Sequence, residues 1–235
     1  MFNKIDKIKL DNYFNELAKI YKRKSHGYIF EFILVGGASI LINYDFRDIT
    51  NDIDADFLPS ADIKESIIKV SKKFHMSANW INNDFKNTKS YSKNLAEFST
   101  FYKTFMEIIS VRTIKDEYLI AMKLMSGRKY KNDISDIVGI LSASNANGKN
   151  ITFDMIDTAV NNLYNGWDNI SKDIIEILDT ILHTKNLSKL YNEIRNEETK
   201  THDQLVEFDN NYKGKINQSN INDILNMLNK KSWDL

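Results

Sequence analysis

The chain of 235 residues contains 42% hydrophobic and 27% charged residues, which is typical of a globular protein, and its length allows one large domain or a compact domain with a smaller helical partner. It has no cysteine and only four scattered histidines, so thiolate sites and cysteine nucleophiles are excluded and any metal is expected to have oxygen ligands. Basic and acidic residues are balanced at 32 each, which argues against non-specific coating of nucleic acid.

The N-terminal segment predicts an amphipathic helix, because Phe14, Leu17, Ile20 and Tyr21 recur at spacings of three and four. Charged residues interrupt this segment, so it does not resemble a secretory signal. No apolar run in the sequence approaches the roughly 20 residues that span a bilayer. We therefore expect a cytosolic (cytoplasmic) protein without a membrane partner.

A β-rich apolar run from Tyr28 to Val35 ends abruptly at Gly36 and Gly37, which predicts a buried strand that enters a tight turn. The chain then has room for a short helix, Ala38–Asn43. Without Cβ atoms, the two glycines allow the backbone to approach a triphosphate closely, and the next helix offers N–H groups to it. Ser39 adds a hydroxyl to this predicted phosphate cradle.

Acidic and apolar residues alternate from Asp52 to Phe57, so Asp52, Asp54 and Asp56 share one face of a predicted strand. Two carboxylates one residue apart on a strand can together ligate one or two magnesium ions. Metal ions held in this way stabilise the attacking and leaving oxygens of a displacement at phosphorus. The acidic pair and the preceding glycine turn therefore predict phosphoryl chemistry, with Mg²⁺ or Mn²⁺ bound by Asp52 and Asp54.

The next segment is predicted to be helical. Pro59 ends the acidic strand, and Asp62 with Glu65 predicts a capping box for a helix that runs to about Phe74. Residues 77–103 are polar and do not indicate a particular structure.

After this region, the mostly apolar run Phe105–Val111 predicts a strand. Thr113 with Asp116 then predicts the cap of a helix that Gly127 stops. After a basic cluster, another helix is expected to begin near Asp133.

The C-terminal third is predicted to be helical. Residues 142–150 contain asparagine and glycine and predict a linker. We expect a catalytic domain over residues 1–144 and a helical domain over residues 150–235. Amphipathic helices are predicted after Ser171, over Leu187–Arg195 and over Ile221–Lys230.

Two stretches resemble nucleotidyltransferase-fold proteins related to AbiEii-type toxins of bacterial toxin–antitoxin and phage-defence systems. They are VGGASILINYDFRDITNDIDADF and YLIAMKLMSGRKYKNDISDIVGIL, and the resemblance covers roughly residues 30–141. In that family a Gly-Gly turn is followed by an arginine and Asp-x-Asp, and later by a helix with lysine, arginine and aspartate. The matching positions here are Gly36, Gly37, Arg47, Thr50, Asp52, Asp54, Lys123, Arg128, Asp133 and Asp136. Two residues separate Arg47 from Thr50, not one as in the tightest form of the motif.

The resemblance implies an α/β (α+β) fold with a small mixed sheet flanked by helices, followed by a helical C-terminal region. It implies catalytic roles for Asp52 and Asp54, with Lys123 and Arg128 neutralising triphosphate charge. Because such enzymes commonly use a third carboxylate, Glu107 in the strand Phe105–Val111 is the candidate. The residues expected at the nucleotide are Gly36, Gly37, Ser39, Arg47, Thr50, Lys123, Arg128 and Asp133.

Structural interpretations of the same residues compete with these roles. Lys123 could be an ordinary surface lysine, and Arg128 could pair with Asp133 or Asp136 without contacting a ligand. Arg47 could simply brace the loop before the acidic strand.

The expected reaction is transfer of a nucleoside monophosphate from an NTP to an acceptor hydroxyl, with release of pyrophosphate. By resemblance the acceptor is RNA, specifically the 3′ end of tRNA, which would make the protein a toxin with a possible cognate antitoxin. A small antibiotic, such as an aminoglycoside or lincosamide, is a second possible acceptor. A third hypothesis is a non-catalytic binding module that has kept the scaffold.

Overall fold

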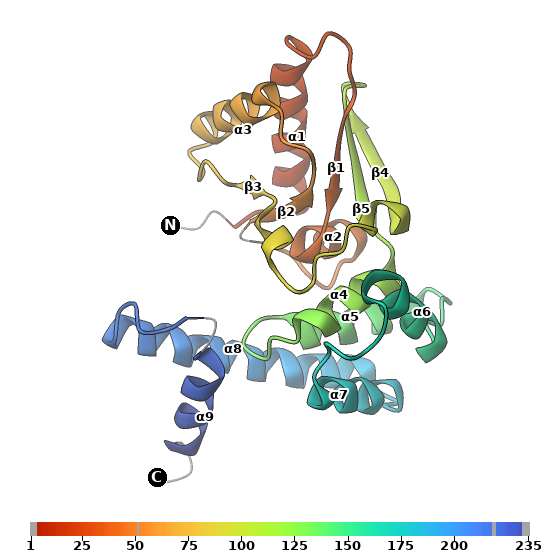
Figure 1. Ribbon diagram of the computed structural model, residues 1–235, viewed down its shortest axis with the longest axis vertical. Helices are drawn as coiled ribbons and strands as arrows, with labels where there is room; N and C mark the ends of the chain where they lie inside the picture. The colour runs from red at the N-terminus through yellow and green to blue at the C-terminus, as the bar shows by residue number, and fades with distance from the viewer. Residues whose placement is uncertain (1–3, 51, 218–219, 232–235) are drawn as a thin grey trace.

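The computed structural model describes residues 4–50, 52–217 and 220–231 (Figure 1). Its strands are β1 (Phe30–Leu34), β2 (Ile53–Asp56), β3 (Ile81–Asn82), β4 (Ser99–Phe105) and β5 (Ile109–Ile114). The first five helices are α1 (Lys7–Lys22), α2 (Gly36–Asn43), α3 (Ala61–Lys73), α4 (Asp116–Ser126) and α5 (Asp133–Ala146). The later helices are α6 (Phe153–Tyr164), α7 (Lys172–Leu182), α8 (Leu187–Asn211) and α9 (Ile221–Lys231), and short 3-10 turns are η1 (Asp84–Asn87) and η2 (Leu95–Phe98).

The five strands form one mixed sheet in the order β3-β2-β1-β5-β4. β1 is parallel to β5 and antiparallel to β2, whereas β4 and β5 form an antiparallel hairpin. Leu34 pairs with Ala55, and the Val35 N–H donates to the Asp54 carbonyl at 3.0 Å. This register brings the end of β1 beside the acidic strand. The predicted fold class, a small mixed sheet flanked by helices, is confirmed.

One hydrophobic core lies between the sheet and the helices α1 and α3 (Figure 1). Phe14 of α1 stacks on Phe105 with 5.4 Å between ring centroids and meets Phe32 edge-on at 5.6 Å. The periodic apolar residues of the N-terminal segment therefore form a helix because they bury this stripe against the sheet.

A second core joins the lower ends of β1 and β5 to the helices α4 to α7 (Figure 1). It includes Ile33 from the sheet, Leu119 from α4, Ile137 from α5 and Ile174 from α7. The core contains residues from both sides of the predicted domain boundary, and the division at residues 144–150 stays a prediction. None of the helices in the described ranges has the length and apolarity that crossing a membrane requires.

The strand predicted over Phe105–Val111 was wrong, because the chain turns within it. β4 ends at Phe105, Met106 and Glu107 have positive φ values of 48° and 59°, and β5 begins at Ile109. This hairpin also accounts for the end of the region that gave no prediction, since β4 begins at Ser99.

Several helix boundaries also differ from the predicted ones. Ser60, not Asp62, caps α3, because its hydroxyl accepts the Ile63 N–H at 3.3 Å. The N-cap of α4 is Lys115, so Thr113 lies within β5 instead. The predicted linker over residues 142–150 began too early, since α5 continues to Ala146. The helix predicted over Leu187–Arg195 continues to Asn211.

Candidate active site

A cavity of about 490 Å³ lies at the end of β1, between β2, η1 and the connection from α4 to α5. We call it the nucleotide cavity. Its lining includes Asp52 and Asp54 from the acidic strand and three cationic side chains from α4 and the loop that follows. The cations are Lys123, Arg128 and Lys131, and Gly36 lines the cavity beside them.

Gly36 and Gly37 serve different purposes at the bend. Gly36 has a φ of +55°, a left-handed conformation that favours glycine, and a Cβ there would lie 3.6 Å from Asp54 Oδ2. A Cβ on Gly37 would lie 2.8 Å from Arg47 Nη2 and 2.9 Å from Thr50 Oγ1. Gly36 therefore keeps the backbone close to the acidic pair, whereas Gly37 makes room for the Arg47 and Thr50 side chains.

We expect Gly37→Ala to lower the free energy of unfolding by about 1–3 kcal/mol, because the added methyl group overpacks this contact. In the wild-type structure the Arg47 guanidinium donates to Asp136 Oδ2 at 2.7 Å. A methyl group at position 37 would displace Arg47 and so strain this ion pair. Urea unfolding of the two proteins would measure the difference. Unchanged stability would show that Arg47 and Thr50 do not pack against Gly37.

Asp52 and Asp54 face the same cavity, and their proximity perturbs one of them. Burial and the charge of Asp52 raise the pKa of Asp54 to about 6, although Lys131, Arg128 and Lys123 act in the opposite direction. A carboxylate pair of this kind fits a divalent cation, which would offset the repulsion.

The part of the chain that the structure describes contains no group of three or more acidic or histidine side chains that could hold a metal ion. Magnesium is commonly bound through one or two carboxylates, with phosphate oxygens and water completing its coordination. The chemistry of Asp52 and Asp54 therefore fits magnesium that is held jointly by the protein and a nucleotide.

Two cations of the nucleotide cavity are held in place by buried aspartates. Lys123 Nζ lies 2.9 Å from Asp133 Oδ1 and 2.8 Å from Asp136 Oδ2, and Arg128 Nε lies 2.8 Å from Asp133 Oδ2. Lys123 is only 7% exposed, so it is not a surface lysine. The structural pairing of Arg128 with Asp133 is present, and Arg128 also lines the cavity. This network joins α4 to the start of α5 and fixes both cations.

Lys131 is a cavity residue that the sequence prediction missed. Its side chain makes no ion pair in the described part of the chain, and burial followed by the Arg128 charge lowers its pKa. The neighbouring Lys129 instead pairs with Asp173, outside the nucleotide cavity. The basic cluster after α4 was a visible signal, but only the loop conformation shows that Lys131 lines the cavity.

Five residues expected at the nucleotide do not line the cavity: Gly37, Ser39, Arg47, Thr50 and Asp133. Ser39 is fully buried and its hydroxyl accepts the Ile114 N–H at 3.3 Å, so it connects α2 to β5. Thr50 is 4% exposed and donates to the Asp52 carbonyl at 3.0 Å. Arg47 and Asp133 are engaged in the ion pairs described above. These side chains pack outside the cavity and hold the residues that line it. For Arg47, this agrees with the competing interpretation that it braces the loop before the acidic strand.

Glu107 is not placed to be a third carboxylate. It lies in the β4–β5 turn, at the opposite end of the sheet from α2 (Figure 1). Ile109 pairs with Phe30, and Val35, which lies beside Asp54, is five positions further along the chain, so Glu107 lies roughly 16 Å or more from the acidic pair. The correction follows from the hairpin turn that the sequence did not reveal.

The opposite wall of the nucleotide cavity comes from the segment that sequence patterns left unassigned. Asp84, Asn87, Thr88 and Ser90 line it from η1 and the residues after it. Their hydroxyl, amide and carboxylate groups are of the kinds that contact a ribose or a base. No periodicity in the sequence indicated them.

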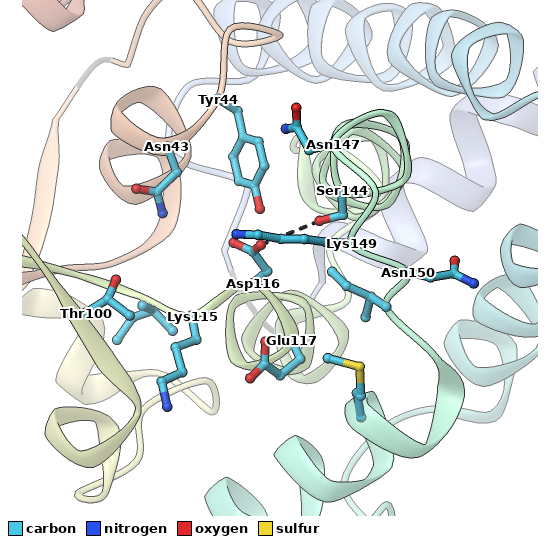
Figure 2. A pocket seen from close by; sticks show the side chains of 13 residues that line it. Asn43, Tyr44, Thr100, Lys115, Asp116, Glu117, Ser144, Asn147, Lys149 and Asn150 are labelled. Carbon is cyan, nitrogen blue, oxygen red and sulfur yellow. Dashed lines mark hydrogen bonds between the residues drawn. The ribbon is translucent and has the colours of Figure 1, made fainter.

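A different cavity, of about 480 Å³, lies at the other end of α2 (Figure 2). The hydroxyls of Tyr44 and Ser144 point toward Asp116, and Ser144 Oγ lies 3.5 Å from Asp116 Oδ2. The eight residues of α2 separate its two ends by about 12 Å. This cavity contains neither the acidic pair nor the glycine bend, so it is not the candidate active site.

Glu198 of α8 supports the active-site network from the C-terminal helices. Its Oε1 accepts the N–H groups of Ile134 and Ser135 at 3.0 and 3.2 Å, which caps the N-terminus of α5. Burial raises the pKa of Glu198 to about 7, and the nearby Asp136 charge acts in the same direction. The capping contact joins residues more than 60 positions apart, and no local pattern predicts it.

We expect Glu198→Gln to remove part of the pH dependence of stability. The pKa of Glu198 rises from its ordinary value of 4.5 to about 7 on folding, so the free energy of unfolding falls as pH rises between these values. The neutral glutamine can still accept both N–H groups and should be more stable than wild type at pH 8, by up to about 3 kcal/mol. Urea unfolding at pH 4.5 and pH 8 measures this effect. Identical pH profiles for the two proteins would contradict it.

The mixed sheet flanked by helices is consistent with a nucleotidyltransferase-like fold. A family described as nucleotidyltransferases of unknown function (DUF6036) matches residues 8–147, and the chain belongs to this family. The match contains the whole sheet together with α4 and α5. No match was found among curated proteins or among solved structures.

Proposed function

We propose that the protein transfers a nucleoside monophosphate from an NTP to an acceptor hydroxyl, with Mg²⁺ or Mn²⁺ bound by Asp52 and Asp54. One observation carries the proposal. Two carboxylates and the cations Arg128 and Lys131 line the same cavity beside a glycine bend. This combination is complementary to a triphosphate with a bound metal ion. The acids can bind the metal ion, and the basic side chains can bind the phosphates.

The residues around the cavity have different roles in the proposed transfer. When bound, the divalent ion polarises the phosphoryl group and offsets the charge that develops on its oxygens. Arg128 and Lys131 bind the β- and γ-phosphates and stabilise the pyrophosphate as it leaves. The buried Asp133 holds Arg128 in position, so the cation does not have to be ordered when the nucleotide binds. Because Gly36 has no Cβ, the backbone at this bend can approach the phosphates closely.

For the acceptor we propose RNA, specifically the 3′ end of tRNA, and hence a toxin role with a cognate antitoxin. The resemblance of residues 30–141 to AbiEii-type toxins supports this choice. Lys89 and Lys93 also support it, because both are exposed and belong to the segment that lines the nucleotide cavity through Thr88 and Ser90. Such lysines suit a phosphate backbone that enters the cavity from outside.

The experiment incubates the protein with each α-phosphate-labelled NTP, Mg²⁺ and separate pools of tRNA, protein, aminoglycosides and lincosamides. We expect label in the tRNA pool with at least one NTP, and its loss when EDTA removes the divalent ion. Transfer that continues without a divalent ion would contradict the role of Asp52 and Asp54. Label in an antibiotic pool would replace the RNA acceptor, and no label in any pool would favour a non-catalytic binding module.

A further inference from the structure

A cavity of about 770 Å³ lies between α7, α8, α9 and the loop that joins α4 to α5. We call it the α8 cavity. It shares no lining residue with the nucleotide cavity, although both touch the same loop: Gly127 and Lys129 line the α8 cavity, whereas Arg128 and Lys131 line the other. Its volume is that of a site for a small organic molecule.

The walls of the α8 cavity combine apolar surface with negative charge. Its apolar residues are Ile134, Ile177, Leu190, Ile194 and Leu225. Its acids are Asp173, Glu193, Glu197 and Glu198, and its single basic residue, Lys129, is paired with Asp173. The acids of this lining therefore outnumber its basic residues.

The four acids differ in how their charge is balanced. Glu193 lies 3.6 Å from Lys189, and Glu197 lies 2.9 Å from Lys200, so each has a cation on α8. Glu198 has no cation in the described part of the chain, although it is only 4% exposed. Its Oε1 accepts two backbone N–H groups, but its buried Oε2 has no hydrogen-bond partner. A buried carboxylate oxygen without a partner is costly, and it identifies the group that a ligand would satisfy.

We propose that the α8 cavity binds an organic ammonium ion whose alkyl chain lies on the apolar walls while its N–H group donates to Glu198 Oε2. An inorganic cation would leave the surfaces of Ile177, Leu190 and Leu225 without contact. A neutral apolar ligand would leave Glu198 Oε2 unsatisfied. An alkylammonium ion satisfies both, because charge-assisted hydrogen bonds are strong and the alkyl chain leaves water.

The ligand would also act on the active-site network. Glu198 caps α5, whose first turn carries Asp133 and Asp136, the partners of Lys123. Binding at Oε2 would hold this carboxylate in its capping position and so stabilise the start of α5. We therefore expect a ligand-dependent increase in melting temperature, which does not require transferase activity.

The test measures binding of hexylamine to the full chain at pH 8 by calorimetry, together with the melting temperature. Hexan-1-ol is the neutral probe of the same length. Hexylamine is expected to bind and to raise the melting temperature, whereas hexan-1-ol is expected to bind at least tenfold more weakly. Equal affinity for the two probes, or no binding of hexylamine, would overturn the proposal.

Two variants separate the ligand site from the fold. Glu198→Gln keeps an oxygen for both N–H groups of α5, and it should bind hexylamine at least tenfold more weakly. Glu207→Gln, on the same helix but outside the cavity lining, is the matched control and should bind as wild type does. Ile177→Trp should also abolish binding, because the larger side chain fills the cavity without touching the charge of Glu198. Undiminished affinity in both Glu198→Gln and Ile177→Trp would place the amine elsewhere.

Discussion

Asp54→Asn should lower the rate of nucleotide transfer by at least about 100-fold, because a neutral amide cannot replace a carboxylate that shares a divalent cation with Asp52. The substitution preserves side-chain size. Since burial raises the pKa of Asp54, removing its charge also removes a desolvation penalty, so the fold is expected to survive. The rate is measured as label transferred from an α-phosphate-labelled NTP, and circular dichroism checks the fold.

Glu107→Gln provides the matched control for this experiment. Glu107 is an exposed acid in the β4–β5 turn, which connects two strands of the sheet that contains Asp54. The control should transfer label at the wild-type rate. A folded Asp54→Asn protein that retains full activity would remove the acidic pair from the mechanism, and a large loss in Glu107→Gln would restore the third carboxylate predicted from the sequence.

The core of the site was predictable because its signals are local. Gly36 and Gly37 follow an apolar strand directly, and Asp52 and Asp54 alternate with apolar residues within the next 18 positions. Only one further condition was needed, the antiparallel pairing of β1 with β2, which places Val35 against Asp54. Strands that are consecutive in the sequence lie next to each other in a sheet in roughly two-thirds of cases.

The β4–β5 turn was not predictable in the same way. The run from Phe105 to Val111 is largely apolar, and turns usually contain glycine, asparagine or proline. Met106 and Glu107 nevertheless adopt left-handed conformations, which neither residue type favours. The pairing of β4 with β5 outweighs this local preference, and the prediction for Glu107 was wrong as a result.

Long-range partners decide the roles of the remaining residues. Arg47 contacts Asp136, which lies 89 positions later, and Glu198 contacts Ile134, which lies 64 positions earlier. The motif therefore identified Arg47 as important, but the local sequence did not distinguish a ligand contact from a supporting ion pair. Likewise, the sequence does not distinguish the three neighbouring basic residues Arg128, Lys129 and Lys131. The conformation of the loop decides that Lys129 pairs with Asp173.

Asp133→Asn should lower the free energy of unfolding by about 3–5 kcal/mol, because it removes the charge that Lys123 and Arg128 share in a buried network. Asp133 is fully buried, accepts from Lys123 Nζ at 2.9 Å and from Arg128 Nε at 2.8 Å, and these cations hold its pKa well below its usual range. Urea unfolding at pH 7 measures the loss. Asp168→Asn, at an exposed position, should change stability by less than about 0.5 kcal/mol. An equally small change in the free energy of unfolding for Asp133→Asn would mean that Asp136 alone neutralises Lys123. It would also mean that the position of Arg128 in the nucleotide cavity does not depend on its ion pair with α5.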